Sequence, residues 1–221
     1  MRQNKIGKCD TDRSAADRVY KAERVRGMEV LGITGGVGSG KSMVLEYLEK
    51  AYGAFVCQMD ETARKLQRKG TRCFQRIVEA FGQEILDSRG ELDRAALGSI
   101  VFASAEKLRQ LNGIVHPEVI REVDFDIRKK AAEGVRLYVV EAALLPDVGK
   151  ELCDEIWYIY ADENVRRDRL KAARGYTDNK ISQMIASQPE EERFRSVCSV
   201  VIDNSGDFED TKKQIGDNLQ L

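Results

Sequence analysis

Short apolar runs and longer amphipathic segments alternate along this 221-residue chain from Met28 onward. The apolar runs predict five β-strands, at 30–34, 54–59, 136–140, 156–160 and 197–202. Short, nearly all-apolar strands that alternate with helices are typical of a parallel sheet buried on both sides. The pattern therefore predicts an α/β fold, a five-stranded parallel sheet with helices on both faces.

The segment between the second and third strands, residues 60–133, predicts several helices and contains little strand-like sequence. A crossover between parallel strands needs only a dozen or more residues. We therefore interpret this segment as an inserted helical lobe that could hold a second substrate. The remaining core then comprises 28–59, 134–162 and 196–221.

Residues 1–27 show neither strand alternation nor a convincing buried helical face. We interpret them as an N-terminal tail, either disordered or lying upstream of a native start at Met28. Because they are rich in Lys, Arg and Asp and lack an apolar core region, they do not resemble a secretory signal.

Composition excludes several classes of protein. The formal net charge of −1 gives no global field that would attract nucleic acid or an anionic membrane. The five cysteines are scattered and never spaced as CxxC, which argues against a disulfide framework or a zinc cluster. The longest apolar stretch, 137–145, is interrupted by Glu141 and is shorter than the roughly 20 residues of a membrane helix. We expect a cytoplasmic monomer or weak homo-oligomer.

The strongest chemical signal is the segment 35–42, GGVGSGKS, which matches GxxxxGK[ST] between an apolar strand and an amphipathic helix. Glycines let successive backbone N–H groups point at phosphate oxygens, and the helix N-terminus adds positive potential. Lys41 can reach the β- and γ-phosphates, and Ser42 can ligate Mg²⁺. A Gly-rich turn without a ligand is the alternative, but the complete motif in this context favours a nucleoside triphosphate. The predicted nucleotide-binding residues are Gly36, Val37, Gly38, Ser39, Gly40, Lys41, Ser42 and Met43.

Asp60 follows the second strand directly. The carboxyl ends of parallel strands meet at one crevice, so an acid there can accept a proton from a substrate hydroxyl that attacks the γ-phosphate. An ordinary helix N-cap is the other interpretation of Asp60. The guanine-reading sequence NKxD is absent, and 137–141 ends in a single acid, which disfavours a GTPase or a motor ATPase.

Basic residues crowd into the segment after the fourth strand, which we interpret as a small lid at about 163–195. Arginines on a closing segment would neutralise charge on the transferred phosphoryl group and exclude water. A solvated basic helix face is the commoner meaning of such a run and fits two or three of these residues. Arg174, beside Gly175, is the predicted catalytic arginine. The run consists of Arg166, Arg167, Arg169, Lys171 and Arg174.

From Met28 onward the chain resembles the dephospho-CoA kinase family. The phosphate loop alone is generic, but the ordered combination of motifs is specific. They are LGITGGVGSGKS at 31–42, DETAR at 60–64, FGQEIL at 81–86, GELDR at 90–94, IVF at 100–102, IVHP at 114–117, Leu144-Leu145 and VIDNSG at 201–206.

The resemblance implies a P-loop kinase core with a helical CoA-side lobe and a lid. It implies transfer of the γ-phosphate of ATP, with Mg²⁺, to the 3′-hydroxyl of dephospho-CoA. It places the catalytic aspartate at Asp60, the lid arginine at Arg174 and the DNSG turn beside the adenine. Taken without the resemblance, His116-Pro117 reads as a helix start with proline at the first helical position.

The chain departs from the family pattern at three places near the site. Met43 stands where Thr is common, a change that matters little because Ser42 alone can serve the metal. Gln58 stands where many members carry a first aspartate, so only Asp60 remains of that pair. Glu141-Ala142-Ala143 replaces a more usual acid-x-Pro, and Glu141 either holds a metal-bound water or simply ends the strand.

Two other functions stay open on the sequence. A kinase acting on a nucleoside monophosphate or similar acceptor would share the loop, lid and core. A nucleotide-binding regulator without turnover is the alternative outside enzymes, and Lys41, Ser42 and Asp60 argue against it.

Overall fold

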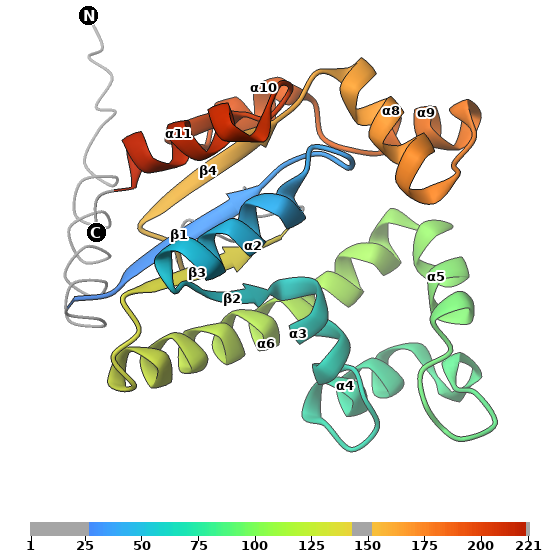
Figure 1. Ribbon diagram of the computed structural model, residues 1–221. Coiled ribbons are helices and arrows are strands. Elements are labelled where there is room, and N and C mark those ends of the chain that lie inside the picture. Colours follow the sequence, from blue (N-terminus) through green and yellow to red (C-terminus); the bar gives the residue numbers. More distant parts are fainter. Residues whose placement is uncertain (1–26, 143–151, 220–221) are drawn as a thin grey trace, which may run out of the picture.

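A computed structural model describes residues 27–142 and 152–219 (Figure 1). The predicted tail, apart from Gly27, and the Leu144-Leu145 pair lie outside the described residues. In the part of the chain that the structure describes, no helix is both long enough and apolar enough to cross a membrane.

The five predicted strands form one sheet in the order β2-β3-β1-β4-β5, with every neighbouring pair parallel. The predicted sheet is confirmed, although its last strand begins three residues later than expected, because the Val197 N–H donates to the Phe194 carbonyl in the turn that ends the preceding helix. The strands are β1 (Glu29–Thr34), β2 (Phe55–Gln58), β3 (Leu137–Glu141), β4 (Glu155–Tyr160) and β5 (Val200–Asp203).

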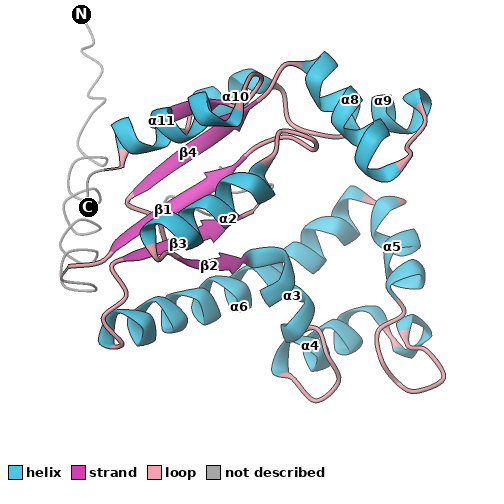
Figure 2. Ribbon diagram, viewed as in Figure 1, coloured by secondary structure: helices cyan, strands magenta, loops and turns pink. Residues whose placement is uncertain are grey.

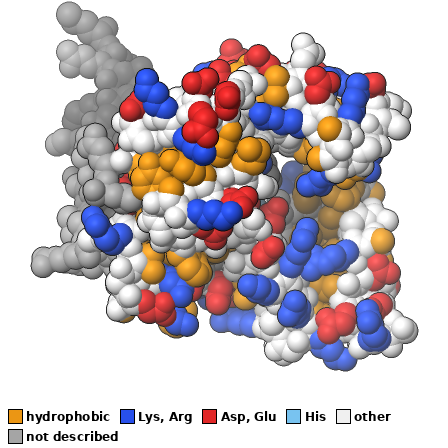
Figure 3. Space-filling model, viewed as in Figure 1, with side chains coloured by type: hydrophobic (Ala, Val, Ile, Leu, Met, Phe, Trp, Pro, Cys, Tyr) orange, Lys and Arg blue, Asp and Glu red, His pale blue; other side chains and the backbone are white. Residues whose placement is uncertain are grey.

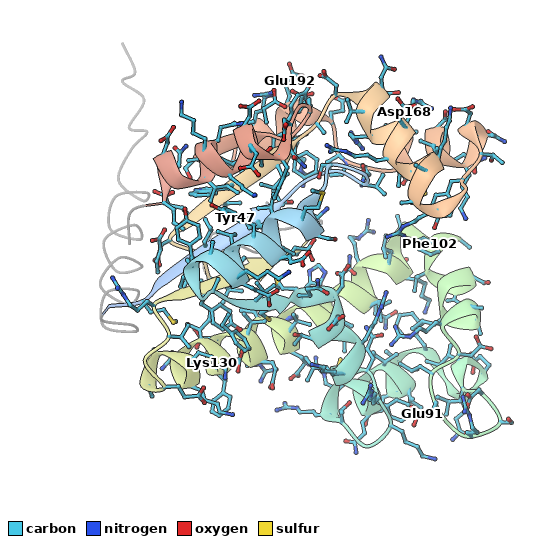
Figure 4. The ribbon with its side chains drawn as sticks, viewed as in Figure 1. Tyr47, Glu91, Phe102, Lys130, Asp168 and Glu192 are labelled. Carbon is cyan, nitrogen blue, oxygen red and sulfur yellow. The ribbon has the colours of Figure 1, made fainter. Side chains whose placement is uncertain are left out.

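Both faces of the sheet are covered, as the apolar strands predict. Side chains alternate between the faces, so Leu31 and Trp157 join α2 (Lys41–Tyr52) and α11 (Phe208–Asn218) in one core. Val30, Tyr138 and Val140 lie on the other face of the sheet, in a second core with the long helix α6 (Ala105–Ala132). Trp157 and Tyr158, neighbours in β4, are both buried. Figure 4 labels Tyr47, whose ring contacts Phe208 edge-on and so links α2 to α11.

Residues 60–133 do form a helical lobe at one end of the sheet (Figure 2). The lobe consists of α3 (Met59–Leu66), α4 (Arg72–Phe81), a 3₁₀ turn (Gln83–Ile85), α5 (Arg94–Phe102) and α6 (Ala105–Ala132). Helices α3, α4 and α5 pack on α6, which runs back beneath the sheet. Phe102, 84% exposed, lies at the lobe tip that faces the lid (Figure 4).

The expected helix start at His116-Pro117 is wrong. Pro117 lies inside α6, although an interior proline removes one helical hydrogen bond and costs about 3 kcal/mol. The helix continues because its buried stripe contacts the sheet and the lobe on both sides of the proline. That stripe consists of Ile114, Val115, Val119, Val123 and Ile127. Burial at 1.5–3 kcal/mol per large side chain, as an order of magnitude, outweighs the local penalty.

Three helices cover the opposite side of the phosphate loop in the region predicted as the lid. They are α8 (Glu163–Arg174), α9 (Asp178–Ala186) and α10 (Glu191–Arg195). Figure 1 shows α8 and α9 across from the lobe, on the far side of the carboxyl ends of the strands.

Candidate active site

The segment 35–42 joins β1 to α2 and carries the geometry expected of a phosphate loop. Gly40 caps α2 in the left-handed conformation, with φ of 88°, and α2 begins at Lys41. A Cβ at Gly40 would approach Nδ2 of Asn204 to 2.2 Å. Glycine is therefore required at this position both for its backbone angle and for space.

Lys41 turns back toward the loop. Its Nζ donates to the Gly35 carbonyl at 2.8 Å and lies 3.9 Å from Oε1 of Glu141. Burial lowers the pKa of the Lys41 ammonium below its ordinary value, while the charges of Glu141 and Asp60 act in the opposite direction. The three side chains therefore share one electrostatic environment, as the sequence predicted for the strand ends.

Glu141 ends β3 opposite Gln58 of β2 and Ile33 of β1. Burial raises the pKa of its carboxyl group, Lys41 lowers it, and Asp60 raises it further. Glu141 thus belongs to the same carboxyl edge as the phosphate loop rather than only ending its strand.

The N-cap interpretation of Asp60 is wrong. The N-cap of α3 is Gln58, and Asp60 is the second residue of the helix, with an exposed side chain. A carboxylate in the first turn is favoured by the helix dipole, but its side chain is free to face a ligand.

Two cavities are lined by residues at or just beyond the ends of β2 and β3. A cleft of about 540 Å³ is lined by Gln58 and Glu141 together with the phosphate loop and α8. A cavity of about 330 Å³ in the lobe is lined by Asp60 and Ala142. Asp60 lines the lobe cavity, two residues along the chain from Gln58, and Ala142 lines it next to Glu141, so residues of the two cavities lie close together along the chain. Figure 3 shows the surface hollowed between lid and lobe, with Lys and Arg side chains around the hollow.

The structure brings most of the predicted loop residues into the cleft, and Arg174 lines the same cleft from the end of α8. Ser39 is the exception. Its side chain is buried, and among the described residues its hydroxyl has no hydrogen-bond partner. The loop residues that line the cleft are Gly36, Val37, Gly38, Gly40, Lys41, Ser42 and Met43.

The basic run of α8 contains two residues that contact the phosphate loop and two that form ion pairs elsewhere. Arg167 pairs with Glu163, and Lys171 pairs with Asp178. Arg166 instead donates from Nε to the Val37 carbonyl at 2.8 Å, and Arg169 donates to the Ser39 carbonyl at 3.4 Å. Their spacing of three, next to buried Leu170, was the available signal, because such residues share one helix face.

The DNSG segment forms the expected strand-to-helix loop and also supports the phosphate loop. Asn204, 1% exposed, donates from Nδ2 to the Ser39 carbonyl at 2.7 Å and accepts from Thr211 at 2.9 Å. Its own carbonyl accepts from Arg169 at 2.8 Å. No local pattern predicts this role of Asn204, because an asparagine in a turn has the same sequence context whatever its side chain contacts.

Ser42 and Glu141 fit the predicted magnesium site in their chemistry. Both line the cleft and offer hard oxygen donors, a hydroxyl and a carboxylate. Among the described residues, no group of three His, Cys, Asp or Glu side chains could hold a metal alone. Mg²⁺ commonly takes one or two protein oxygens and completes its shell with water and phosphate.

Comparison with known proteins identifies the family of this chain. The family model described as dephospho-CoA kinase matches residues 29–210. The dephospho-CoA kinase of Carboxydothermus hydrogenoformans is 38% identical over 195 residues, which are 87% of this chain and 94% of that protein. The one from Geobacter sulfurreducens is 36% identical over 189 residues, 85% of this chain and 95% of that protein.

Solved structures agree on the fold. A Thermus thermophilus protein matches with a TM-score of 0.72 and 27% identity, over 89% of this chain and all of that one. The dephospho-CoA kinase of Campylobacter jejuni matches with a TM-score of 0.55 and 19% identity, over 86% of this chain and 95% of that one. At that identity the second match supports the fold alone.

Proposed function

The chain belongs to the dephospho-CoA kinase family, and we propose that it transfers the γ-phosphate of ATP to the 3′-hydroxyl of dephospho-CoA, which yields CoA. ATP is the phosphoryl donor and binds at the phosphate loop. The acceptor enters from the helical lobe.

The observation that carries the proposal is the position of Asp60. It lines the lobe cavity, two residues from Gln58 in the lining of the phosphate-loop cleft, and its charge acts on Lys41 of that cleft. A donor in the cleft and an acceptor in the lobe cavity would present the γ-phosphate and a hydroxyl to the same carboxylate. Phosphoryl transfer depends mainly on this positioning and on charge neutralisation.

Each residue then has a defined task. Asp60 accepts the proton of the attacking hydroxyl, the loop amides and Lys41 hold the triphosphate, and Arg174 neutralises charge from the lid side. Ser42 would hold Mg²⁺, with Glu141 contacting it through water. When bound, that ion neutralises charge between the β- and γ-phosphates. The lobe and the lid together exclude water, which would otherwise accept the phosphoryl group.

A coupled assay of ADP release with ATP, Mg²⁺ and dephospho-CoA tests the substrate assignment. Nucleoside monophosphates serve as competing acceptors in the same assay. Efficient turnover with a nucleoside monophosphate and none with dephospho-CoA would reject the proposal. ATP binding without turnover on any acceptor would favour a regulator.

Asp60→Asn tests the base. Loss of a general base typically lowers turnover by about 10²–10⁴-fold, and ATP affinity should change little. Glu61→Gln is the matched control, because Glu61 is exposed on the same helix and lines a different cavity. Normal turnover in the Asp60→Asn variant would show that another group accepts the proton.

A further inference from the structure

Both backbone polar atoms of Val37, in the middle of the phosphate loop, are bound by side chains from the lid region. The Val37 N–H donates to Oε1 of Gln188 at 3.1 Å, and its carbonyl accepts from Nε of Arg166 at 2.8 Å. Nη2 of Arg166 also donates to Oε1 of Gln188 at 2.7 Å. The three residues therefore form a closed hydrogen-bonded ring, which we call the loop clamp.

The clamp joins three distant parts of the chain. Arg166 lies on α8, and Gln188 follows α9 directly before Pro189. Val37 is 129 residues from Arg166 and 151 from Gln188. Its members are half-buried, so each bond is partly shielded from water and strengthened accordingly.

Two glycines of the loop make room for the clamp. A Cβ at Gly36 would lie 2.6 Å from Nη2 of Arg166, and one at Gly38 would lie 2.8 Å from the Arg166 carbonyl. Glycine is thus required at position 38, where the close atom is backbone of α8, whereas a side chain at position 36 would push the Arg166 guanidinium out of the clamp.

Gln188 suits this position because its amide is neutral. It accepts from Arg166 without cancelling the positive charge of the guanidinium, which lies near enough to Lys41 to lower the pKa of that ammonium. A carboxylate at the same position would accept the same bonds but would offset a charge that favours an anionic ligand.

Support from the clamp matters for the phosphate loop because the loop is rich in glycine. Its glycines give the unliganded segment many accessible backbone conformations, and a ligand must otherwise order them when it binds. A clamp that holds the loop before the ligand arrives removes that cost from binding.

We propose that Gln188 is a positioning residue for nucleotide binding, which acts through Val37 and Arg166 to hold the phosphate loop in its binding conformation. This inference rests on the proposed binding of ATP at the loop. It does not depend on the identity of the acceptor.

Gln188→Met tests the proposal, because methionine has a similar length and lacks the acceptor oxygen. We expect the Kd of Mg-ATP, measured by calorimetry, to rise about five- to thirty-fold. The KM of ATP should rise with it, while kcat and the KM of dephospho-CoA change by less than about twofold. Gln183→Met is the matched control, since Gln183 is exposed on α9, and it should bind ATP like the wild type.

Amide hydrogen exchange of peptides covering 35–42 supplies a second readout in the nucleotide-free protein. These peptides should exchange faster in Gln188→Met, with no change elsewhere in the core. An unchanged or tighter Kd for ATP would overturn the proposal, the latter by showing that Gln188 competes with phosphate. If the wild type binds ATP but does not phosphorylate dephospho-CoA, the proposed function fails and the clamp is still tested.

Discussion

Helix α2 has a glycine in the left-handed conformation at each end. Comparing alanine substitutions at the two positions isolates the cost of a steric contact between the phosphate loop and Asn204. Gly40 at the N-cap and Gly53 at the C-cap have φ of 88° and 66°. A Cβ at Gly53 meets nothing within 4 Å, whereas a Cβ at Gly40 would lie 2.2 Å from Nδ2 of Asn204. The two substitutions to alanine therefore share a backbone penalty and differ in the contact.

The magnitudes follow from these contacts. The left-handed conformation costs alanine about 1–2 kcal/mol at either position. At Gly40 the new methyl group must also displace Asn204 from the Ser39 carbonyl, and leaving buried polar groups unpaired costs about 1–3 kcal/mol more. We expect Gly40→Ala to lower the free energy of unfolding by about 2–5 kcal/mol and Gly53→Ala by about 1–2 kcal/mol.

Urea unfolding of the nucleotide-free protein, followed by circular dichroism, measures both losses, and unchanged m values would support comparison between variants. In an Asn204→Ala background the contact is absent, so Gly40→Ala should cost only the backbone penalty of about 1–2 kcal/mol. The reasoning is refuted if Gly40→Ala costs no more than Gly53→Ala, or if the double-mutant cycle shows no coupling between positions 40 and 204.

Two further predictions concern α6 and the buried carboxylate. Pro117 is exposed, so Pro117→Ala should lose no packing and should restore a helical hydrogen bond. We expect the free energy of unfolding to rise by about 1–2 kcal/mol, once the greater conformational entropy of the unfolded alanine variant is subtracted. A lower urea midpoint would contradict this. Burial raises the folded pKa of Glu141 above its ordinary value of 4.5, so its ionisation favours the unfolded state. The wild type should therefore lose stability relative to Glu141→Gln as pH rises through that raised pKa, when urea unfolding is compared at about pH 4 and pH 8. An equal difference at both pH values would rule out the burial of this charge.

Local patterns were sufficient for the sheet and for the chemistry of the loop. Apolar runs mark strands wherever both faces are buried, and the phosphate motif places Lys41 and Ser42 by spacing alone. Local rules failed at Pro117, where the buried stripe of α6 outweighs the preference of proline for a helix start. They also failed at Asp60, because the N-cap of that helix lies two residues earlier, at Gln58.

The supporting contacts of the loop lay beyond prediction from one sequence. Arg166, Gln188 and Asn204 bind loop residues that are 129 to 165 positions away. A glutamine before a proline or an asparagine in a turn has the same local pattern whether or not it contacts such a partner. Only the packing of α8, α9 and β5 around the loop distinguishes them.

The bond between Asn204 and the Ser39 carbonyl has a consequence for biosynthesis. The ribosome adds Asn204 165 residues after Ser39, a delay of roughly 10–30 s at typical elongation rates of about 5–20 residues per second. The nucleotide site therefore acquires its full set of supports only after Asn204 has been synthesised. A nascent chain holds the phosphate-loop motif early, but the loop gains this support only once β5 and the segment after it have been made.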